Sequence, residues 1–224
     1  MKPLNVPIVR QEKDSVDCGI AAVNMITKFW KLPFTFEQIQ KNLEADKFGT
    51  YCPQLGSFLI KNGFKVTVTT FNPGLFTLNE IGASQDKIKN HLEKISNTKS
   101  KAIAGYGIKT SNDKRAVKFF LQFMKDGGVV EVKIPTEEDI REELKSKNPS
   151  IVVLTSSFLF AKNPRFNFHF NVVTGIDRKF VYVNDPLWDE RGGKHKYKIS
   201  DFLFGMYAGA GGGVDNPSLI RIRK

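Results

Sequence analysis

The sequence is organised around one segment, Arg10-Gln11-Glu12-Lys13-Asp14-Ser15-Val16-Asp17-Cys18-Gly19-Ile20-Ala21-Ala22, in which a cysteine follows a polar loop and opens an apolar run. Asp17 is a good N-cap residue, and apolar side chains recur at spacings of three and four from Ile20 to Trp30. This pattern predicts a helix that begins at Cys18 and ends near Trp30. The Cys18 sulfur would then lie in the first helical turn, where the partial positive charge favours the thiolate.

A cysteine in this position has two interpretations. Most free cysteines are small buried apolar residues, and Cys18 could be one of them. A nucleophilic cysteine needs a base, and the chain contains three histidines. His91 is expected on a helix surface and His195 lies between two lysines, so both are predicted to be solvated. His169 is therefore the candidate base.

His169 opens a predicted β-hairpin. Apolar residues alternate over 168–172, a second β-rich run covers 180–183, and turn-forming residues lie between the two runs. If the turn is centred on Asp177, His169 stands directly opposite Asp185, with the two Cβ atoms ~5 Å apart. Asp185 could then accept a hydrogen bond from the imidazole and fix its orientation. A slip of one residue would place the two side chains on opposite faces.

The order of these motifs can be compared with known families. The chain contains Gln11, then Asp17-Cys18-Gly19-x-Ala21-Ala22 at a helix start, then His169-Phe170-x-Val172-Val173-x-Gly175, and finally Tyr182-Val183-Asn184-Asp185-Pro186. In this order it resembles the papain-like cysteine peptidases that remove double-glycine leaders from bacteriocin precursors, together with their stand-alone relatives. The resemblance covers roughly Asn5 to Val68 and Pro149 to Trp188.

The resemblance implies a role for each motif. By it, Cys18 is the nucleophile, His169 is the general base and acid, and Asp185 is the orienting acid. Gln11 is implied as the side-chain oxyanion donor, although its loop carries one residue more than in the family. These roles fit hydrolysis of a peptide or isopeptide bond through an acyl-enzyme, without a cofactor.

The same resemblance implies an α+β, papain-like fold, with N-terminal helices packed on a C-terminal antiparallel sheet. A length of 224 residues favours a single domain. The surplus over the family falls at about residues 75–128, a lysine-rich segment that we predict to be a basic helical insertion packed on the core and forming one wall of the cleft. Further helices are predicted near residues 35–43, 53–62, 136–147 and 200–206, strands near 64–71, 129–134, 150–160 and 218–222, and an edge strand or extended arm at 4–9.

Composition limits the possible compartments and cofactors. Two cysteines far apart in sequence make no disulfide framework, which indicates a reducing environment, and Cys52 is predicted to be a small buried residue. No run approaches the ~20 apolar residues of a membrane span, and the N-terminus has no apolar signal region, so a cytoplasmic protein is expected. The histidines and cysteines have no metal-ligand spacing, so no metal is expected. The glycine-rich stretches at 192–194 and 209–213 are predicted to be flexible, and neither matches a phosphate-binding loop.

The formal charge of +11 leaves other functions open. Lysine-rich helices could bind nucleic acid, but no nucleic-acid motif is present and the phenylalanines fall at core spacing. An acidic peptide or protein substrate, attracted by the positive field, accounts for the charge and agrees with the peptidase hypothesis. The alternatives that remain are an acyl or peptidyl transferase on the same fold, and a peptide-binding or nucleic-acid-binding protein that does not hydrolyse its ligand.

Overall fold

The computed structural model describes residues 2–43, 45, 47, 49–97, 111–163, 167–208 and 217–224. Its helices are α1 (Cys18–Phe29), α2 (Phe36–Asn42), α3 (Cys52–Lys61), the 3-10 turn η1 (Leu78–Glu80), α4 (Gln85–Asn97), α5 (Ser111–Lys125), α6 (Glu137–Lys145), α7 (Ser157–Phe160) and α8 (Ile199–Tyr207). Its strands are β1 (Lys65–Thr70), β2 (Val129–Val132), β3 (Ser150–Leu154), β4 (His169–Ile176), β5 (Phe180–Asp185), β6 (Gly193–Lys198) and β7 (Ser218–Arg223). The glycine-rich stretch at 209–213 lies outside the described residues.

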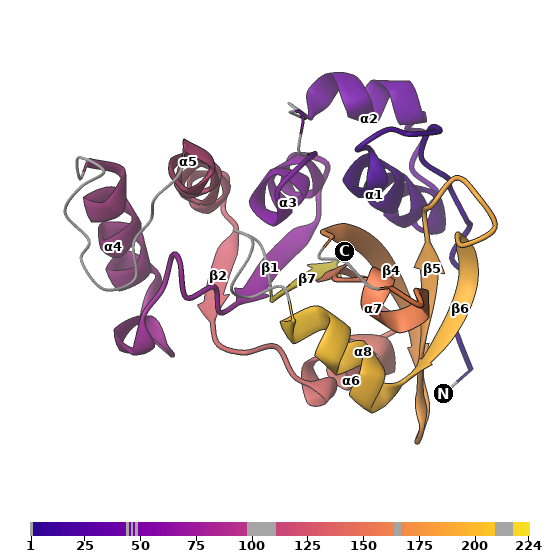
Figure 1. The fold of residues 1–224 in the computed structure, drawn as a ribbon. Helices are drawn as coiled ribbons and strands as arrows, with labels where there is room; N and C mark the ends of the chain where they lie inside the picture. Colours follow the sequence, from indigo (N-terminus) through magenta and orange to yellow (C-terminus); the bar gives the residue numbers. More distant parts are fainter. Residues whose placement is uncertain are drawn as a thin grey trace.

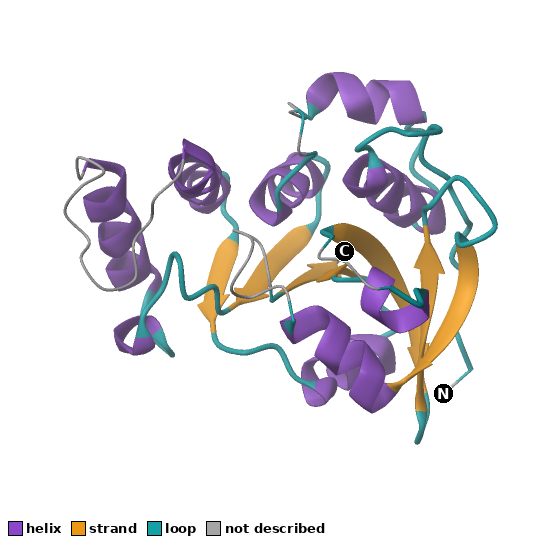
Figure 2. Cartoon of the chain, viewed as in Figure 1, coloured by secondary structure: helices purple, strands orange, loops and turns teal. Residues whose placement is uncertain are grey.

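The strands form one seven-stranded sheet in the order β2-β1-β7-β3-β4-β5-β6. Helices α1, α3 and α5 cover one face of this sheet, and α6 and α8 cover the other (Figures 1 and 2). All neighbouring strands pair antiparallel except β1 and β2, which are parallel. The predicted arrangement of N-terminal helices on a largely antiparallel sheet is confirmed.

The helix that carries Cys18 begins where the sequence predicts. Asp17 occupies the N-cap position, but its side chain makes no capping hydrogen bond. Instead, the Asp17 Oδ2 atom accepts a hydrogen bond from the Gln40 Nε2 atom of α2 at 3.3 Å. Helix α2 has the expected capping box between Thr35 and Gln38, which satisfies two backbone N–H groups. Asp17 therefore joins the first two helices and leaves the first turn of α1 uncapped.

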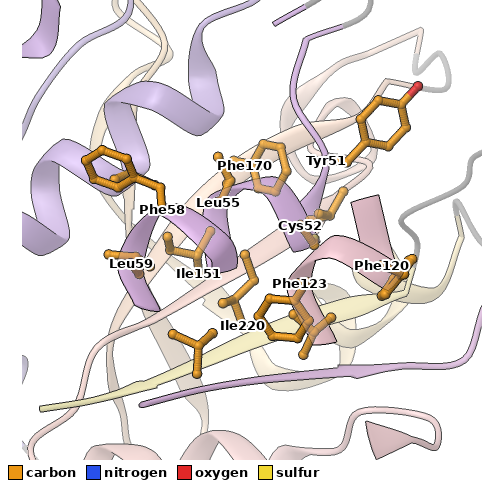
Figure 3. Packing of buried hydrophobic residues seen from close by; sticks show 14 of the residues in the cluster. Tyr51, Cys52, Leu55, Phe58, Leu59, Phe120, Phe123, Ile151, Phe170 and Ile220 are labelled. Atoms are coloured by element: carbon orange, nitrogen blue, oxygen red, sulfur yellow. The ribbon is translucent and has the colours of Figure 1, made fainter. Parts of the chain in front are cut away.

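The segment at 75–128 leads to an additional strand at one edge of the sheet. Helices α4 and α5 connect β1 to its parallel neighbour β2, so the insertion forms a crossover that adds a strand to the sheet edge. Phe123 of α5 is fully buried, and its ring would lie 2.5 Å and 2.3 Å from Cβ atoms placed on Gly56 and Gly128. Figure 3 shows part of the shared core, in which Phe123 clusters with residues of α3, β3 and β7. Residues of α4 and α5 thus belong to the same core as α3, β3 and β7, whereas their status as an insertion stays a prediction.

The insertion is separated from the helix that carries Cys18 by another helix. Helix α3 lies between α5 and α1 (Figure 1). The Phe119 ring of α5 packs at 5.4 Å from the Tyr51 ring, just before α3, and the neighbouring Thr50 lies against Gly19 of α1. That the insertion forms one wall of the cleft therefore stays a prediction.

Two strand predictions need correction. The strand predicted over 150–160 ends at Leu154, the last residue paired with β4, because the Thr155 N–H then donates to the Gly205 oxygen of α8 at 2.8 Å. The chain leaves the sheet at that point and forms α7. In the stretch at 192–194, predicted to be flexible, Gly193 instead opens β6, which pairs with β5 from Asp185–Gly193 to Phe180–Lys198. Its alternating lysines face solvent at a sheet edge, where charge prevents further strand pairing.

Residues 4–11 form an extended arm and not a strand. The Leu4 N–H donates to the Thr174 oxygen at 2.7 Å, and the Asn184 side chain donates to the Val6 oxygen at 2.9 Å. The arm therefore follows the β4–β5 hairpin and ends at Gln11, beside the end of β5. Within the described residues, no helix is long and apolar enough to cross a membrane.

Candidate active site

The β4–β5 hairpin has a different register from the predicted one. Val172 pairs with Asn184 and Val173 with Val183, so Asp185 falls beside residue 171, and not beside His169. The prediction was wrong by two residues. A two-residue shift preserves the face of a strand, so His169 and Asp185 remain diagonal neighbours on one face.

Two local features cause this shift. The turn is centred between Arg178 and Lys179, because the Asp177 carboxylate accepts the N–H groups of Lys179 and Phe180 at 2.7 Å and 2.8 Å. A bulge at Thr174 adds one unpaired residue to β4. Together they move the pairing of the strand ends by two residues.

His169 and Asp185 form a buried pair. The His169 Nε2 atom lies 2.7 Å from the Asp185 Oδ1 atom, and the two residues are 5% and 0% exposed. The Leu187 N–H donates to the same carboxylate oxygen at 2.8 Å. Burial alone would lower the pKa of the His169 imidazole, but interactions with Asp185 and with the Cys18 sulfur raise it to about 10. These interactions therefore favour the cationic form of the imidazole.

Cys18 lies half-buried in the first turn of α1, beside this imidazole. Because the Nε2 atom of His169 is bonded to Asp185, the Nδ1 atom is left for the thiol. Gly19 has no room for a side chain, since a Cβ atom there would lie 2.2 Å from the Thr50 Oγ1 atom. The start of α1 is therefore held tightly against the rest of the helical layer.

Gln11 is positioned by the N-terminal arm. Its backbone N–H donates to the Pro186 oxygen at 2.8 Å, which ties the arm to the residue after Asp185. Its side-chain Nε2 atom donates to the Ser15 oxygen at 2.7 Å, and its Oε1 atom is buried without a hydrogen-bond partner in the described part of the chain. The second N–H of the Gln11 side-chain amide remains available to another acceptor. In the loop to Cys18, Asp14 adopts a left-handed conformation with a φ of 57°, which aspartate tolerates.

The chain matches the model of the Peptidase_C39-like family over residues 3–212. It belongs to this family. The predicted family and its papain-like α+β fold class are thereby confirmed, and membership supports peptidase activity of the cysteine type. No curated protein matches the chain.

Three solved structures are similar to this C39-like chain. One is a double-glycine motif protease from an AMS/PCAT transporter in complex with the leader peptide, with 14% identity, 100% of this chain and 98% of that chain covered, and a TM-score of 0.49. Another is the peptidase domain of Streptococcus ComA, a bifunctional ABC transporter involved in quorum sensing, with 15% identity, 98% of each chain covered and a TM-score of 0.49. The third is a C39-like peptidase from Bacillus anthracis, with 14% identity, 100% of this chain and 98% of that chain covered, and a TM-score of 0.47.

One polar residue of this C39-like chain lies beside the pair and was missed from sequence. Asn171 is two residues beyond His169 on the same face of β4 and is fully buried. Neither its Nδ2 nor its Oδ1 atom, nor the Asp185 Oδ2 atom, has a hydrogen-bond partner among the described residues. An asparagine inside an otherwise apolar buried strand is the signal that could have indicated it.

The other candidate residues lie elsewhere. His91 is not solvated as predicted, since its Nε2 atom lies 2.7 Å from the Leu75 oxygen and its Nδ1 atom 3.3 Å from the Glu80 carboxylate. His195 is half-buried and stacks on Tyr197. Cys52 is fully buried, as predicted. The described residues contain no group of three or more potential metal ligands.

Proposed function

We propose that this chain is a cysteine peptidase in which Cys18, His169 and Asp185 act as the catalytic triad. The observation that carries the proposal is the buried 2.7 Å contact between the His169 Nε2 atom and Asp185, at the first turn of the Cys18 helix. The raised pKa of His169, about 10, supports a thiolate–imidazolium pair at neutral pH. Such a pair combines a strong nucleophile with a proton donor before substrate arrives.

The proposed reaction has two halves. In the first, the Cys18 thiolate attacks the carbonyl carbon of the scissile bond, and the His169 Nδ1–H donates its proton to the leaving amine as the C–N bond breaks. In the second, the neutral imidazole takes a proton from water, which attacks the thioester and releases the acid and the thiolate. Asp185 remains ionised throughout and holds the imidazole in the tautomer that faces the sulfur.

The oxyanion that forms in each half needs hydrogen-bond donors. We assign this role to the Cys18 backbone N–H, at the uncapped N-terminus of α1, and to the remaining N–H of the Gln11 amide. Since the Gln11 Nε2 atom already donates to the Ser15 oxygen, its amide plane is fixed before substrate binds. This arrangement supports a donor that does not reorganise during the reaction.

The substrate class follows from charge. A formal charge of +11 favours an acidic peptide or protein, attracted at long range. The same triad would also serve transfer to an amine acceptor, and the two activities differ only in which acceptor reaches the thioester. Product analysis by mass spectrometry separates the two, because only hydrolysis yields a free carboxylate in the presence of an added amine.

The deciding experiment is the pH dependence of Cys18 alkylation by iodoacetamide, in wild type and in His169→Ala. Peptide mapping assigns the label to Cys18, and buried Cys52 serves as an internal reference. Fast labelling well below pH 8 that is lost in His169→Ala is the expected result. Labelling that rises only near the ordinary thiol pKa of ~8.5 in both proteins would contradict the proposed function.

A further inference from the structure

The β5–β6 loop, residues 186–192, follows Asp185 and is held to the N-terminal arm by Arg10. We propose that Arg10 is a positioning residue, which docks the arm on this loop and thereby sets the orientation of both Asp185 and Gln11. This inference rests on the proposed function, since it concerns the same triad.

The key element is the peptide unit between Pro186 and Leu187. Its oxygen accepts the Gln11 N–H at 2.8 Å, and its N–H donates to the Asp185 Oδ1 atom at 2.8 Å. The same Oδ1 atom holds the His169 Nε2 atom at 2.7 Å. A continuous hydrogen-bonded chain therefore runs from the arm to the imidazole, and hydrogen bonds in series strengthen one another.

Arg10 fixes the peptide units that follow. Its Nη1 atom donates to the Leu187 oxygen at 2.9 Å and to the Asp189 oxygen at 2.5 Å. A single guanidinium thus holds two carbonyl groups of the loop in a defined relation, which a lysine ammonium could not do with the same planar geometry. Because Leu187 is held through its oxygen, its N–H is kept pointed at Asp185.

Gly192 is the counterpart of Arg10 on the other side of the loop. A Cβ atom at Gly192 would lie 1.9 Å from the Leu187 oxygen and 2.9 Å from the Arg10 Nη1 atom. Any side chain there would displace the same carbonyl that Arg10 holds. The sequence thus contains two residues, 182 positions apart in the chain by their numbers, that restrain one oxygen.

The loop does not need Arg10 in order to form. The Gly192 N–H closes a turn onto the Asp189 oxygen at 3.0 Å, and the Asp189 carboxylate is paired with the Arg191 guanidinium. Arg10 itself is exposed to solvent. Its removal should therefore affect the alignment of Asp185 more than the stability of the fold.

The experiment compares Arg10→Ala with a matched control, Arg178→Ala. Arg178 is an exposed arginine at the far tip of the β4–β5 hairpin, so the control makes the same change in charge. The measurement is the ratio of the Cys18 alkylation rate at pH 6 to that at pH 9.5, with iodoacetamide as the probe. The rate at pH 9.5 reports access to the sulfur, and the rate at pH 6 also requires the imidazolium.

Arg10→Ala is expected to lower this ratio about fivefold, because a misaligned Asp185 holds the imidazolium less well. The rate at pH 9.5 and the melting temperature should stay close to those of wild type, and Arg178→Ala should change nothing. A ratio in Arg10→Ala equal to that of the control would overturn the positioning role. Slow labelling of wild type at pH 6 would overturn the proposed function together with it.

A second variant tests the shared oxygen independently. Gly192→Ala should lower the same ratio, and the double variant should lose much less than the product of the two single effects, because both changes release one carbonyl. Multiplicative effects would show that the two residues act separately and would refute the mechanism. If Gly192→Ala folds poorly, the comparison of Arg10→Ala with Arg178→Ala still tests the positioning role.

Discussion

Two glutamines, one beside the β2 edge of the sheet and one beside the β4–β5 hairpin, differ in how their side-chain amides are hydrogen-bonded. At the β2 edge, Gln85 uses both of its amide atoms, donating to the Val130 oxygen at 2.7 Å and accepting the Val130 N–H at 2.9 Å. At the β4–β5 end, the Oε1 atom of Gln11 is buried without a partner among the described residues. Gln85 thus has partners for both amide atoms, whereas Gln11 leaves its amide oxygen without one among the described residues.

Two buried charged groups also respond to opposite pH extremes: Glu143 of α6, beside the interior strand β7, and His169 of the candidate site. Burial would raise the pKa of the Glu143 carboxyl, but hydrogen bonds from Arg223 and Arg221 of β7 lower it. The stability from Glu143 is therefore present above the ordinary carboxyl pKa and is lost as pH falls. The pKa of His169 is raised from 6.5 to about 10, so its contribution is complete below pH 6.5 and is lost as pH rises toward 10. Acid weakens the scaffold, and alkali weakens the site.

The largest expected effect comes from Cys18, the proposed nucleophile. Cys18→Ala should lower the rate of peptide hydrolysis by at least ~10,000-fold, because no other group can form the thioester. Since the residue is only half-buried, the melting temperature should change by no more than a few degrees. Turnover of an internally quenched peptide checks the loss of hydrolysis, and calorimetry checks the melting temperature. A large loss of stability would instead indicate a structural cysteine.

A smaller effect is expected at the orienting acid. Asp185→Asn should lower kcat by about 1,000-fold through loss of imidazole orientation. Removing the negative charge also lowers the pKa of His169, so the alkaline limb of the pH–rate profile should move to lower pH. The profile of kcat/KM between pH 5 and pH 10 checks the sign. An unchanged alkaline limb would remove Asp185 from the triad.

Gln11 is expected to matter less than the triad. Gln11→Ala should slow turnover by about 100-fold if its amide stabilises the oxyanion, with little change in the alkylation rate of Cys18, since alkylation forms no oxyanion. The two rates measured on one preparation therefore separate oxyanion binding from thiolate formation. A near-wild-type turnover would assign the donor role to another group.

Gln85→Ala tests the corresponding amide hydrogen bonds at the β2 edge of the sheet. It leaves the N–H and oxygen of buried Val130 without partners and should cost about 1–2 kcal/mol of unfolding free energy. Turnover should remain within about twofold of wild type. Gln122→Ala is the control, because Gln122 is exposed on α5 and bonds only to Asp126 within four residues. Denaturant unfolding of the two variants gives the comparison, and equal stabilities would show that the edge bonds contribute nothing.

Much of the site could be predicted because its signals are local. A cysteine after an N-cap residue, and a histidine and an aspartate on two β-rich runs, are visible in the sequence, and the structure brings Cys18, His169 and Asp185 together. The register could not be predicted, because it depends on the side-chain bonds of Asp177 and on the bulge at Thr174. The turn position and the bulge together shift the pairing by two residues, an even number, so His169 and Asp185 still lie on the same face of the hairpin.

The missed features depend on contacts distant in sequence. The strand β6 begins with a glycine and then alternates lysines with His195 and Tyr197, and its pairing with β5 makes it a strand. His91 was placed in solvent because its helix looks polar, yet η1 supplies Glu80 to its Nδ1 atom. In each case the local sequence favours exposure, and a tertiary partner changes the outcome.

The N-terminal arm also determines when the site can exist. The Asn184 side chain holds the Val6 oxygen across 178 residues of sequence, so the arm has no binding surface until the β4–β5 hairpin has been made. During synthesis, which proceeds from the N-terminus, Cys18 emerges long before His169 and Asp185. A nascent chain that has not yet reached β4 therefore carries the Cys18 thiol without its proposed base, His169.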